Sequence, residues 1–241
     1  MSQSRSETER LDRIAATYDP SNPDEEFDYF LKRLHREVVG PWLLGARVLE
    51  MGCSTGELTS LLSPLAKEYH VVEGSQKNID VAKRRVPTGT YFHSLWEDFT
   101  PNTEYSDIVL SNALEHAREP VPLLERLRDW LGADGRIHIV VPNSESLHRH
   151  VGVAMGMLES STALSESDLR IGHYRVYSIE TLLADVRAAG LLPRHWQGIF
   201  LKVLSNRQML GWNWELIHAL HEVGQRLPAH CAELYVNATP R

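Results

Sequence analysis

The 241-residue chain is predicted to form an α/β domain with a doubly wound, mostly parallel sheet. From residue 46 onward, short apolar runs alternate with stretches of helical periodicity, and a glycine turn (Gly52 to Gly56) follows the first run. Apolar strands that are separated by helices pair in parallel through right-handed crossovers. A glycine turn after the first strand usually lies at the ligand crevice of such a sheet.

Residues 1–45 are expected to form N-terminal helices that cap the domain. Leu11 and Ile14 recur at helical spacing, and the residues from Phe27 to Leu34 repeat the pattern after a loop with two prolines. The domain itself is expected to span residues 46–241. Its first part should contain strands at 47–50, 69–73, 90–94, 107–111 and 136–142, and helices at 56–66, 76–86 and 119–131.

Residues 143–177 interrupt the alternation and are rich in Ser, His and Gly. An insertion of this length after a strand predicts a substrate lid. Ser178 is the expected N-cap of the next helix, and Gly190 marks its end. A strand at 194–203, a helix at 206–226 and a strand at 231–237 complete the predicted elements.

The last two elements carry further expectations. Residues 231–237 alternate between two sets of side chains, which predicts a strand with one face more exposed than in the central strands. The helix at 206–226 has a rough apolar stripe that includes Trp214 and Ile217. That stripe predicts packing on the sheet or, as the alternative, a homodimer contact.

Composition narrows the class of protein. The formal charge is −7 and no long basic block is present, so no nucleic-acid partner is expected. No apolar run approaches the roughly 18 residues of a membrane span, and no membrane partner is expected. The two cysteines, Cys53 and Cys231, do not make a disulfide framework, and the N-terminus lacks the apolar core of a signal peptide. These features predict a soluble, cytoplasmic protein.

The glycine turn allows three interpretations, because a helix start exposes N–H groups that hold an anionic group. The dinucleotide pattern G-x-G-x-x-G fails, since Ser54 and Glu57 occupy its second and third glycine positions. The pattern G-x-S-x-G is present and would make Ser54 the nucleophile of a serine hydrolase. That fold, however, needs strands and an oxyanion loop before the turn, and neither is predicted.

In the third interpretation, VLEMGCSTGELT resembles the first motif of the class I S-adenosylmethionine-dependent methyltransferases, acid-x-Gly-Cys-Gly-x-Gly, with Ser54 at a usual glycine position. The resemblance extends over residues 46–203. Its segment 107–143 includes Leu114-Glu115-His116, which is typical of the branch that modifies quinones, sugars and natural products. The resemblance implies a Rossmann-like sheet of seven strands with the last strand antiparallel.

The resemblance also implies that S-adenosylmethionine binds over the glycine turn, with Glu50 near its amino group. Glu73 ends the second strand, where a carboxylate can accept hydrogen bonds from both ribose hydroxyls, although a solvated carboxylate is the alternative. The loop 94–99 is expected to hold the adenine or, alternatively, to cap a helix beside the core. The expected cofactor-binding residues are Glu50, Gly52, Cys53, Gly56, Glu73, Gly74, Trp96, Glu97, Asp98 and Asn112.

Methyl transfer from a sulfonium is an in-line displacement, so the protein mainly has to align the acceptor with the methyl group. A hydroxyl acceptor also has to lose a proton, and a histidine suits that task. His116, just past the fourth strand, and His173, in the insertion, are therefore the candidate catalytic residues. Structural roles are the alternative for both.

Three residues are candidates for acceptor contact, with packing as the alternative. Arg175 lies in GHYRVYS, which resembles the segment H-x-R-x-[FY]-[ST] of related small-molecule enzymes, Tyr18 could close the site, and Met155 could line an apolar pocket. His148 and His150 are expected on a solvated helix face. Because residues i and i+2 of a helix do not share a face, no metal site is expected.

The sequence thus predicts transfer of a methyl group from S-adenosylmethionine, which leaves as S-adenosylhomocysteine, to an oxygen or nitrogen of a small-molecule acceptor. A cofactor-binding module without catalysis is the alternative from another class of protein. That alternative predicts tight cofactor binding and no turnover with any acceptor.

Overall fold

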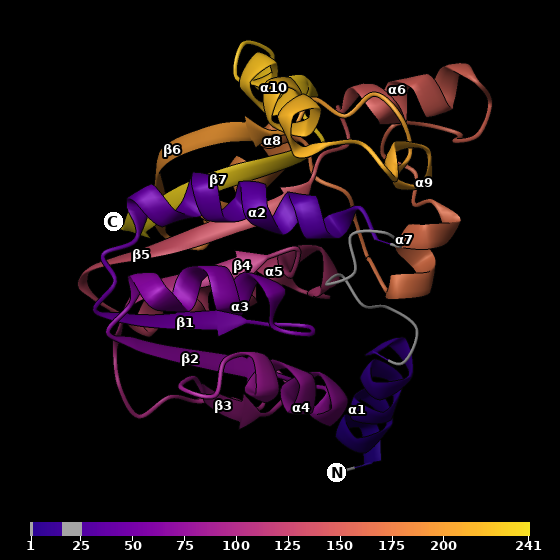
Figure 1. Cartoon of the computed structure of the whole chain (residues 1–241). Coiled ribbons are helices and arrows are strands. Elements are labelled where there is room, and N and C mark those ends of the chain that lie inside the picture. Colours follow the sequence, from indigo (N-terminus) through magenta and orange to yellow (C-terminus); the bar gives the residue numbers. More distant parts are fainter. Residues whose placement is uncertain (1, 16–25) are drawn as a thin grey trace.

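The computed structural model describes residues 2–15 and 26–241 and contains a seven-stranded sheet with helices on both faces (Figure 1). The strands are β1 (Arg47–Met51), β2 (Glu68–Glu73), β3 (Thr90–His93), β4 (Tyr105–Ser111), β5 (Leu131–Pro142), β6 (Leu191–Ile199) and β7 (Glu233–Pro240). Their order is β3-β2-β1-β4-β5-β7-β6. The pairs from β3 to β5 are parallel, whereas β7 is antiparallel to β5 and β6, as expected.

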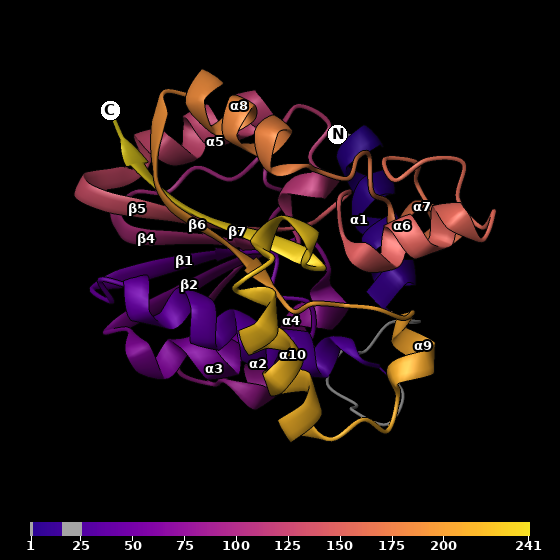
Figure 2. The ribbon, with the colours of Figure 1, turned by 90° about the horizontal axis from the view of Figure 1, so that it is seen from above.

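Helices cover the two faces of the sheet and one end of it. The α-helices of the described chain are α1 (Ser2–Ala15), α2 (Asp28–Val39), α3 (Glu57–Leu62), α4 (Gln76–Arg85), α5 (Pro120–Asp129), α6 (Leu147–Ala154), α7 (Glu166–Ile171), α8 (Ile179–Ala188), α9 (Asn206–Met209) and α10 (Trp214–Gly224). In Figure 2, α5 and α8 cover one face, and α2, α3, α4 and α10 cover the other. Helices α1, α6, α7 and α9 lie beyond the carboxyl ends of the parallel strands (Figures 1 and 2).

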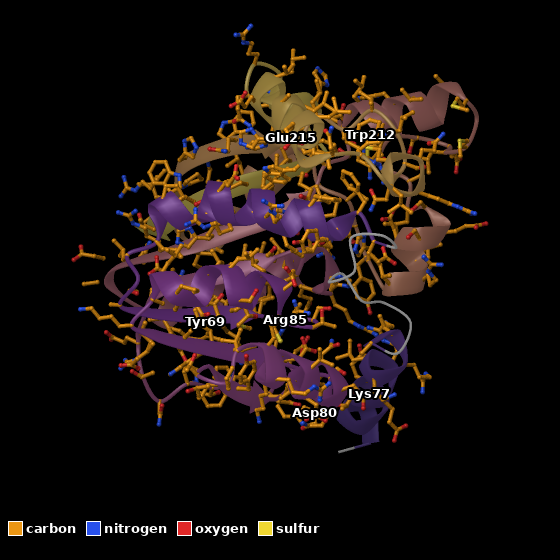
Figure 3. All side chains as sticks on the ribbon, viewed as in Figure 1. Tyr69, Lys77, Asp80, Arg85, Trp212 and Glu215 are labelled. Atoms are coloured by element: carbon orange, nitrogen blue, oxygen red, sulfur yellow. The ribbon has the colours of Figure 1, made fainter. Side chains whose placement is uncertain are left out.

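Each face of the sheet has its own apolar core. Leu124 of α5 and Leu182 of α8 are fully buried on one side, and Leu34 of α2 and Leu62 of α3 are fully buried on the other. Between α3 and α4, Arg85 forms an ion pair with Glu57, which ties the two helices together (Figure 3). Because Leu34 belongs to the core on its face of the sheet, helix α2 shares a core with the sheet. The division of the chain into two parts at residue 45 stays a prediction.

Strand β7 corrects one expectation. The alternation in residues 231–237 was expected to leave one face exposed, but residues 233–238 of β7 are all buried. The reason is position, because β7 lies between β5 and β6 and each of its faces meets a different core. Val236 packs on the α5 side, and Tyr235 packs on the α2 side.

Backbone conformation explains where other elements differ from expectation. The helix expected at 206–226 is divided into α9 and α10, and Gly211 takes a φ of +81° between them. Strand β6 ends at Ile199 because Phe200 takes a φ of +61°, outside the strand region. Ser178 does cap α8 as expected, since its side chain accepts a hydrogen bond from the Thr181 N–H group.

Candidate functional site

A cavity of about 1810 Å³ lies at the carboxyl ends of the parallel strands. Its lining includes the turn after β1, the end of β2, the residues that follow β4, and parts of α6 and α7. The strand order reverses between β1 and β4, which is where doubly wound sheets bind ligands. The cavity is larger than the roughly 300–1,000 Å³ of common ligand pockets, so it can hold two molecules side by side.

The turn after β1 depends on left-handed backbone conformations. Gly52 has a φ of +81°, and its N–H group donates to the carbonyl oxygen of Val72 at 2.8 Å. Gly56 has a φ of +80°, and a Cβ there would lie 2.8 Å from the Cβ of Ala82 in α4. Gly56 does not line the cavity, so its role is to let α3 and α4 approach. Ser54 also has a positive φ, +48°, at a position that glycine occupies without strain.

Glu73 holds this turn from the end of β2. Its Oε2 accepts hydrogen bonds from the N–H groups of Cys53 and Ser54 at 3.1 and 3.2 Å, and its Oε1 accepts one from Ser75 N–H at 2.8 Å. The side chain is buried and lines the cavity, so the alternative of a solvated carboxylate is wrong. Burial raises the pKa of Glu73, although the backbone donors oppose the shift.

Glu50 is buried beneath the same turn. Its Oε2 accepts hydrogen bonds from Thr59 Oγ1 at 2.6 Å and from the Tyr69 hydroxyl at 3.1 Å. Burial raises the pKa of Glu50 to about 7. A cationic group that enters the cavity would stabilise the ionised form of this carboxylate.

The loop after β3 forms another part of the cavity wall. The Trp96 ring lies against Gly52, where an added Cβ would come within 3.2 Å of it. Glu97 and Asp98 line the cavity with exposed side chains. Gly74 also lines it and lies beneath Leu11 of α1, whose Cδ1 would be 2.4 Å from a Cβ there. Nine of the ten expected cofactor residues thus share one cavity, and Gly56 is the exception.

Asn112 joins a buried polar network that was not predicted. Its Nδ2 donates to Glu233 Oε1 at 2.8 Å, and its Oδ1 accepts from Lys32 Nζ at 2.8 Å. Glu233 Oε2 lies 2.6 Å from Nε2 of His35. Although burial opposes the shift, interactions with His35, Lys32 and Asn112 hold the pKa of Glu233 at about 2. In the sequence, this buried network is indicated by polar residues that stand among the apolar positions of α2 and β7.

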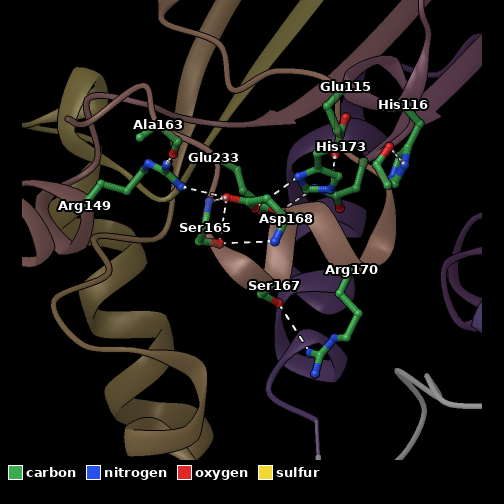
Figure 4. A network of polar contacts seen from close by, with 12 residues as sticks. Glu115, His116, Arg149, Ala163, Ser165, Ser167, Asp168, Arg170, His173 and Glu233 are labelled. Carbon is green, nitrogen blue, oxygen red and sulfur yellow. Dashed lines mark hydrogen bonds and ion pairs between the residues drawn. The ribbon is translucent and has the colours of Figure 1, made fainter. Parts of the chain in front are cut away.

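His116 and His173 are brought together at the cavity wall (Figure 4). Their ring centroids are 4.7 Å apart with the rings nearly perpendicular, at 80°. His173 Nδ1 lies 3.1 Å from Asp168 Oδ1, and His116 Nδ1 lies 3.3 Å from the carbonyl oxygen of Gly172. Burial lowers the pKa of His116 to about 4, so this ring is neutral near pH 7.

Asp168 is itself fixed within the predicted lid. Its Oδ2 accepts hydrogen bonds from the N–H group and the hydroxyl of Ser165 at 2.8 and 2.7 Å, and lies 3.3 Å from Arg149 Nη1 (Figure 4). Ser165 in turn caps α7. The carboxylate that faces His173 therefore has a defined position.

The remaining sequence-based candidates differ in outcome. Arg175 does not line the cavity, because its guanidinium donates to the carbonyl oxygens of Ala117 and Arg118 at 2.6 and 2.8 Å. The structure therefore does not bring Arg175 to the cavity, and its contact with an acceptor stays a prediction. Met155 lies on the cavity wall with 69% of its surface exposed. Tyr18 lies outside the described residues.

The two histidines of α6 lie in different surroundings. His150 is exposed, as expected, but His148 lines the cavity instead of a solvated face. The reason is that the exposed residues of α6, such as His150 and Ala154, lie on one face of the helix, and His148 lies off that face. Burial, aided by the charges of Lys202 and Arg149, lowers the pKa of His148 to about 3.

Ser54 has no catalytic partner of the kind that a serine hydrolase requires. In the part of the chain that the structure describes, no histidine is hydrogen-bonded to its hydroxyl. A nucleophile elbow needs a base within hydrogen-bond reach. The G-x-S-x-G match is therefore explained by the turn geometry alone.

The sheet order with an antiparallel last strand and the glycine turn after β1 are those of the class I methyltransferase fold. The chain belongs to the methyltransferase domain family, whose model matches residues 15–195. This match confirms the family resemblance seen in the glycine turn.

Relatives and solved structures agree with that membership. Nodulation protein S of Bradyrhizobium diazoefficiens is 28% identical over 89 residues, which are 35% of this chain and 42% of that protein. The structure of the N-methyltransferase NodS from Bradyrhizobium japonicum with S-adenosylhomocysteine has a TM-score of 0.63 at 15% identity, covering 97% of this chain and 98% of that one. The plantazolicin methyltransferase BpumL, with a substrate analogue and S-adenosylhomocysteine, has a TM-score of 0.63 at 18% identity, covering 100% and 99%. These likenesses confirm the fold.

Among the described helices, none combines the length and the apolar character that crossing a membrane requires.

Proposed function

We propose that the chain transfers a methyl group from S-adenosylmethionine to an oxygen or nitrogen of a small-molecule acceptor. The observation that carries the proposal is the single cavity that connects the glycine turn with the His116–His173 pair. Its volume, about 1810 Å³, leaves room for a cofactor and an acceptor together. Family membership supports the reaction, and the S-adenosylhomocysteine in two proteins of the same fold supports the cofactor.

The cofactor is proposed to bind against the glycine turn. Glu50, with a pKa of about 7 when no cation is near, is suited to meet its ammonium group. Glu73 is suited to the ribose, because each carboxylate oxygen retains acceptor capacity beyond its backbone donors. Trp96 would cover the adenine, and Glu97 or Asp98 would accept a hydrogen bond from its amine.

The acceptor is proposed to bind between the end of β4 and the segment that carries α6 and α7. His173 is the candidate base, because Asp168 holds its Nδ1 side and favours the charged imidazolium that forms after proton transfer. Burial lowers the pKa of His116 to about 4, which makes it a poor base near pH 7, and it is suited to orient the acceptor. His173 would take the acceptor's proton while the methyl group passes from the sulfonium sulfur to the acceptor atom, which leaves S-adenosylhomocysteine as the second product.

Calorimetry with S-adenosylhomocysteine tests the cofactor assignment. We expect Glu73→Gln to weaken binding by about 1–3 kcal/mol, because a charged hydrogen-bond acceptor is lost. Glu68→Gln, at the exposed start of the same strand, is the matched control and should change binding little. No binding by the unmodified chain would refute the proposal.

A panel of hydroxyl and amine metabolites with labelled methyl donor tests the reaction. Label transfer to at least one acceptor is the expected result. Cofactor binding with no transfer to any acceptor would instead favour a binding module without catalysis.

Location and assembly are further parts of the proposal. A cytoplasmic location is supported by Cys53 and Cys231, which are both buried free thiols. A small-molecule acceptor, and not a nucleic acid, is supported by the charge of −7. A homodimer through α10 is supported by the exposure of Leu216 and Val223, at 45% and 49%. Light scattering after gel filtration would test that contact.

A further inference from the structure

Glu115 is a fully buried carboxylate at the cavity wall. It lies in the short 3-10 helix Leu114–His116 that follows β4. Neither of its oxygens accepts a hydrogen bond from the described part of the chain. An ionised carboxylate is stable in such surroundings only when a cation or several donors face it. Glu115 therefore lacks, within the described residues, the hydrogen-bond donors that a buried carboxylate requires.

Two imidazoles surround this carboxylate. Nε2 of His173 lies 3.8 Å from Oε1 of Glu115. One nitrogen or oxygen from each of Glu115, His116 and His173 can be chosen so that all three atoms lie within 4.8 Å of one another (Figure 4). The three side chains thus converge on one point at the edge of the cavity.

The outer nitrogen of each imidazole faces an oxygen atom of the chain. Nδ1 of His116 lies 3.3 Å from the Gly172 carbonyl oxygen, and Nδ1 of His173 lies 3.1 Å from Asp168 Oδ1. Histidines that bind a metal usually donate their other N–H group to a carbonyl or a carboxylate, which fixes the ring and the tautomer. Both rings therefore keep Nε2 for a ligand, and His173 directs it at Glu115.

We propose that Glu115, His116 and His173 bind a divalent transition-metal ion such as Zn²⁺ or Co²⁺. Two imidazoles and one carboxylate are a common ligand set for these ions, whereas Mg²⁺ and Ca²⁺ prefer oxygen ligands alone. Tetrahedral ligands at about 2.1 Å from an ion are roughly 3.4 Å apart. The 3.8 Å between Glu115 and His173 needs only a small side-chain rotation to reach that spacing. Three protein ligands leave one position open to the cavity.

The open position has a chemical consequence that rests on the proposed function. A metal-bound hydroxyl has a lowered pKa, so a coordinated acceptor would lose its proton more readily, with water in the open cavity as the proton acceptor. In that state the two histidines act as ligands instead of proton acceptors. Metal binding itself does not depend on methyl transfer, and its test does not use turnover.

Cobalt titration of the full chain, freed of metal by a chelator, tests the site. We expect visible d–d absorption that saturates at one Co²⁺ per chain and is displaced by Zn²⁺. Glu115→Gln and His173→Ala should each weaken the binding at least tenfold. Asp168→Asn should weaken it by about 10–100-fold, because His173 loses the carboxylate that faces its Nδ1 while the three ligands remain.

Two controls keep the result interpretable. His150→Ala removes an exposed histidine of the same insertion and should bind Co²⁺ like the unmodified chain. Binding of S-adenosylhomocysteine and the melting temperature report whether each variant is folded. No saturable absorption with a folded chain would overturn the metal site and leave the cofactor assignment intact. Equal Co²⁺ binding by Glu115→Gln, His173→Ala and the unmodified chain would overturn it too.

Discussion

The two halves of the cavity are built in different ways. On the side of β1 and β2, Glu73 binds the N–H groups of Cys53, Ser54 and Ser75, so the wall is backbone held by one carboxylate. On the side of β4, the wall consists of side chains from distant segments, such as His116 and His173. The first half is a rigid turn, and the second is a set of side chains that the insertion completes.

We infer from this difference that the first half of the cavity serves cofactor binding and the second half serves the reaction. A backbone turn binds features of the cofactor, and the cofactor is the same throughout the family. The turn can therefore be the same in many enzymes of the family. Side chains from an insertion can change without disturbing the sheet. We therefore expect substitutions in the second half to alter turnover, and substitutions in the first half to alter stability or cofactor affinity.

His173→Ala gives the largest expected effect. If His173 accepts the acceptor's proton or holds an ion that lowers the pKa of the acceptor's hydroxyl, turnover should fall about 10²–10⁴-fold in the variant. Cofactor affinity, measured by calorimetry, should stay close to that of the unmodified chain. His150→Ala is the matched control, and a rate for His173→Ala within severalfold of the unmodified chain would remove His173 from the mechanism.

Gly56→Ala tests the rigid turn. The new Cβ would lie 2.8 Å from Ala82 Cβ, at a residue whose φ is +80°. Left-handed strain and overpacking together should lower the free energy of unfolding by about 2–4 kcal/mol, measured in urea. Gly211→Ala is the control, because Gly211 has the same sign of φ but nothing within 4 Å of its added Cβ. An equal loss in both variants would mean that close packing of α3 and α4 is unimportant.

Acid should destabilise the second half through His148. Burial lowers its pKa to about 3 in the folded chain, whereas the unfolded value is about 6.5. As the pH falls below about 6.5, His148 takes up a proton in the unfolded chain but stays neutral in the folded chain. The free energy of unfolding therefore falls. From about pH 7.5 to about pH 5, His148 should account for about 1–2 kcal/mol of this loss.

Urea unfolding at both pH values checks the contribution of His148. His148→Gln should lose less stability on acidification than the unmodified chain. His150→Gln changes an exposed histidine and should lose as much stability between the two pH values as the unmodified chain does. If His148→Gln loses as much stability on acidification as the unmodified chain, His148 is protonated equally well in the folded and the unfolded chain.

Ser54→Gly should have the smallest effect. The substitution relieves a positive φ of +48° but increases the freedom of the unfolded chain. The free energy of unfolding should therefore change by less than about 1 kcal/mol, and turnover should persist. Loss of activity on this substitution would instead support Ser54 as a nucleophile.

Much of the first half could be predicted from the sequence because its determinants are local. Gly52 and Gly56 flank a turn of a few residues, and Glu73 ends the next strand. Their mutual position follows from β1 and β2 being parallel neighbours, which the alternation of strands and helices predicts. Even here, the role of Gly56 in helix packing required the structure, since Ala82 belongs to another helix.

The second half was predicted only in part. His116 and His173 were both identified, but their contact with each other and with Glu115 spans an insertion whose path no periodicity describes. His148 was misplaced, and the position of Arg175 off the cavity was not foreseen, for the same reason. Lys32, His35 and Glu233 were missed, because buried polar residues look like surface residues until their partners are known.

The sequence by itself determined the alternation of strands and helices and the glycine turn, because hydrophobic periodicity and turn chemistry act between near neighbours. Its motifs also carried the resemblance to the methyltransferase family. Only the tertiary structure decided that β7 lies inside the sheet and that Glu115, His116 and His173 meet. Those facts depend on which distant segments pack together, and packing is set by the shape and volume of the whole core rather than by any one segment.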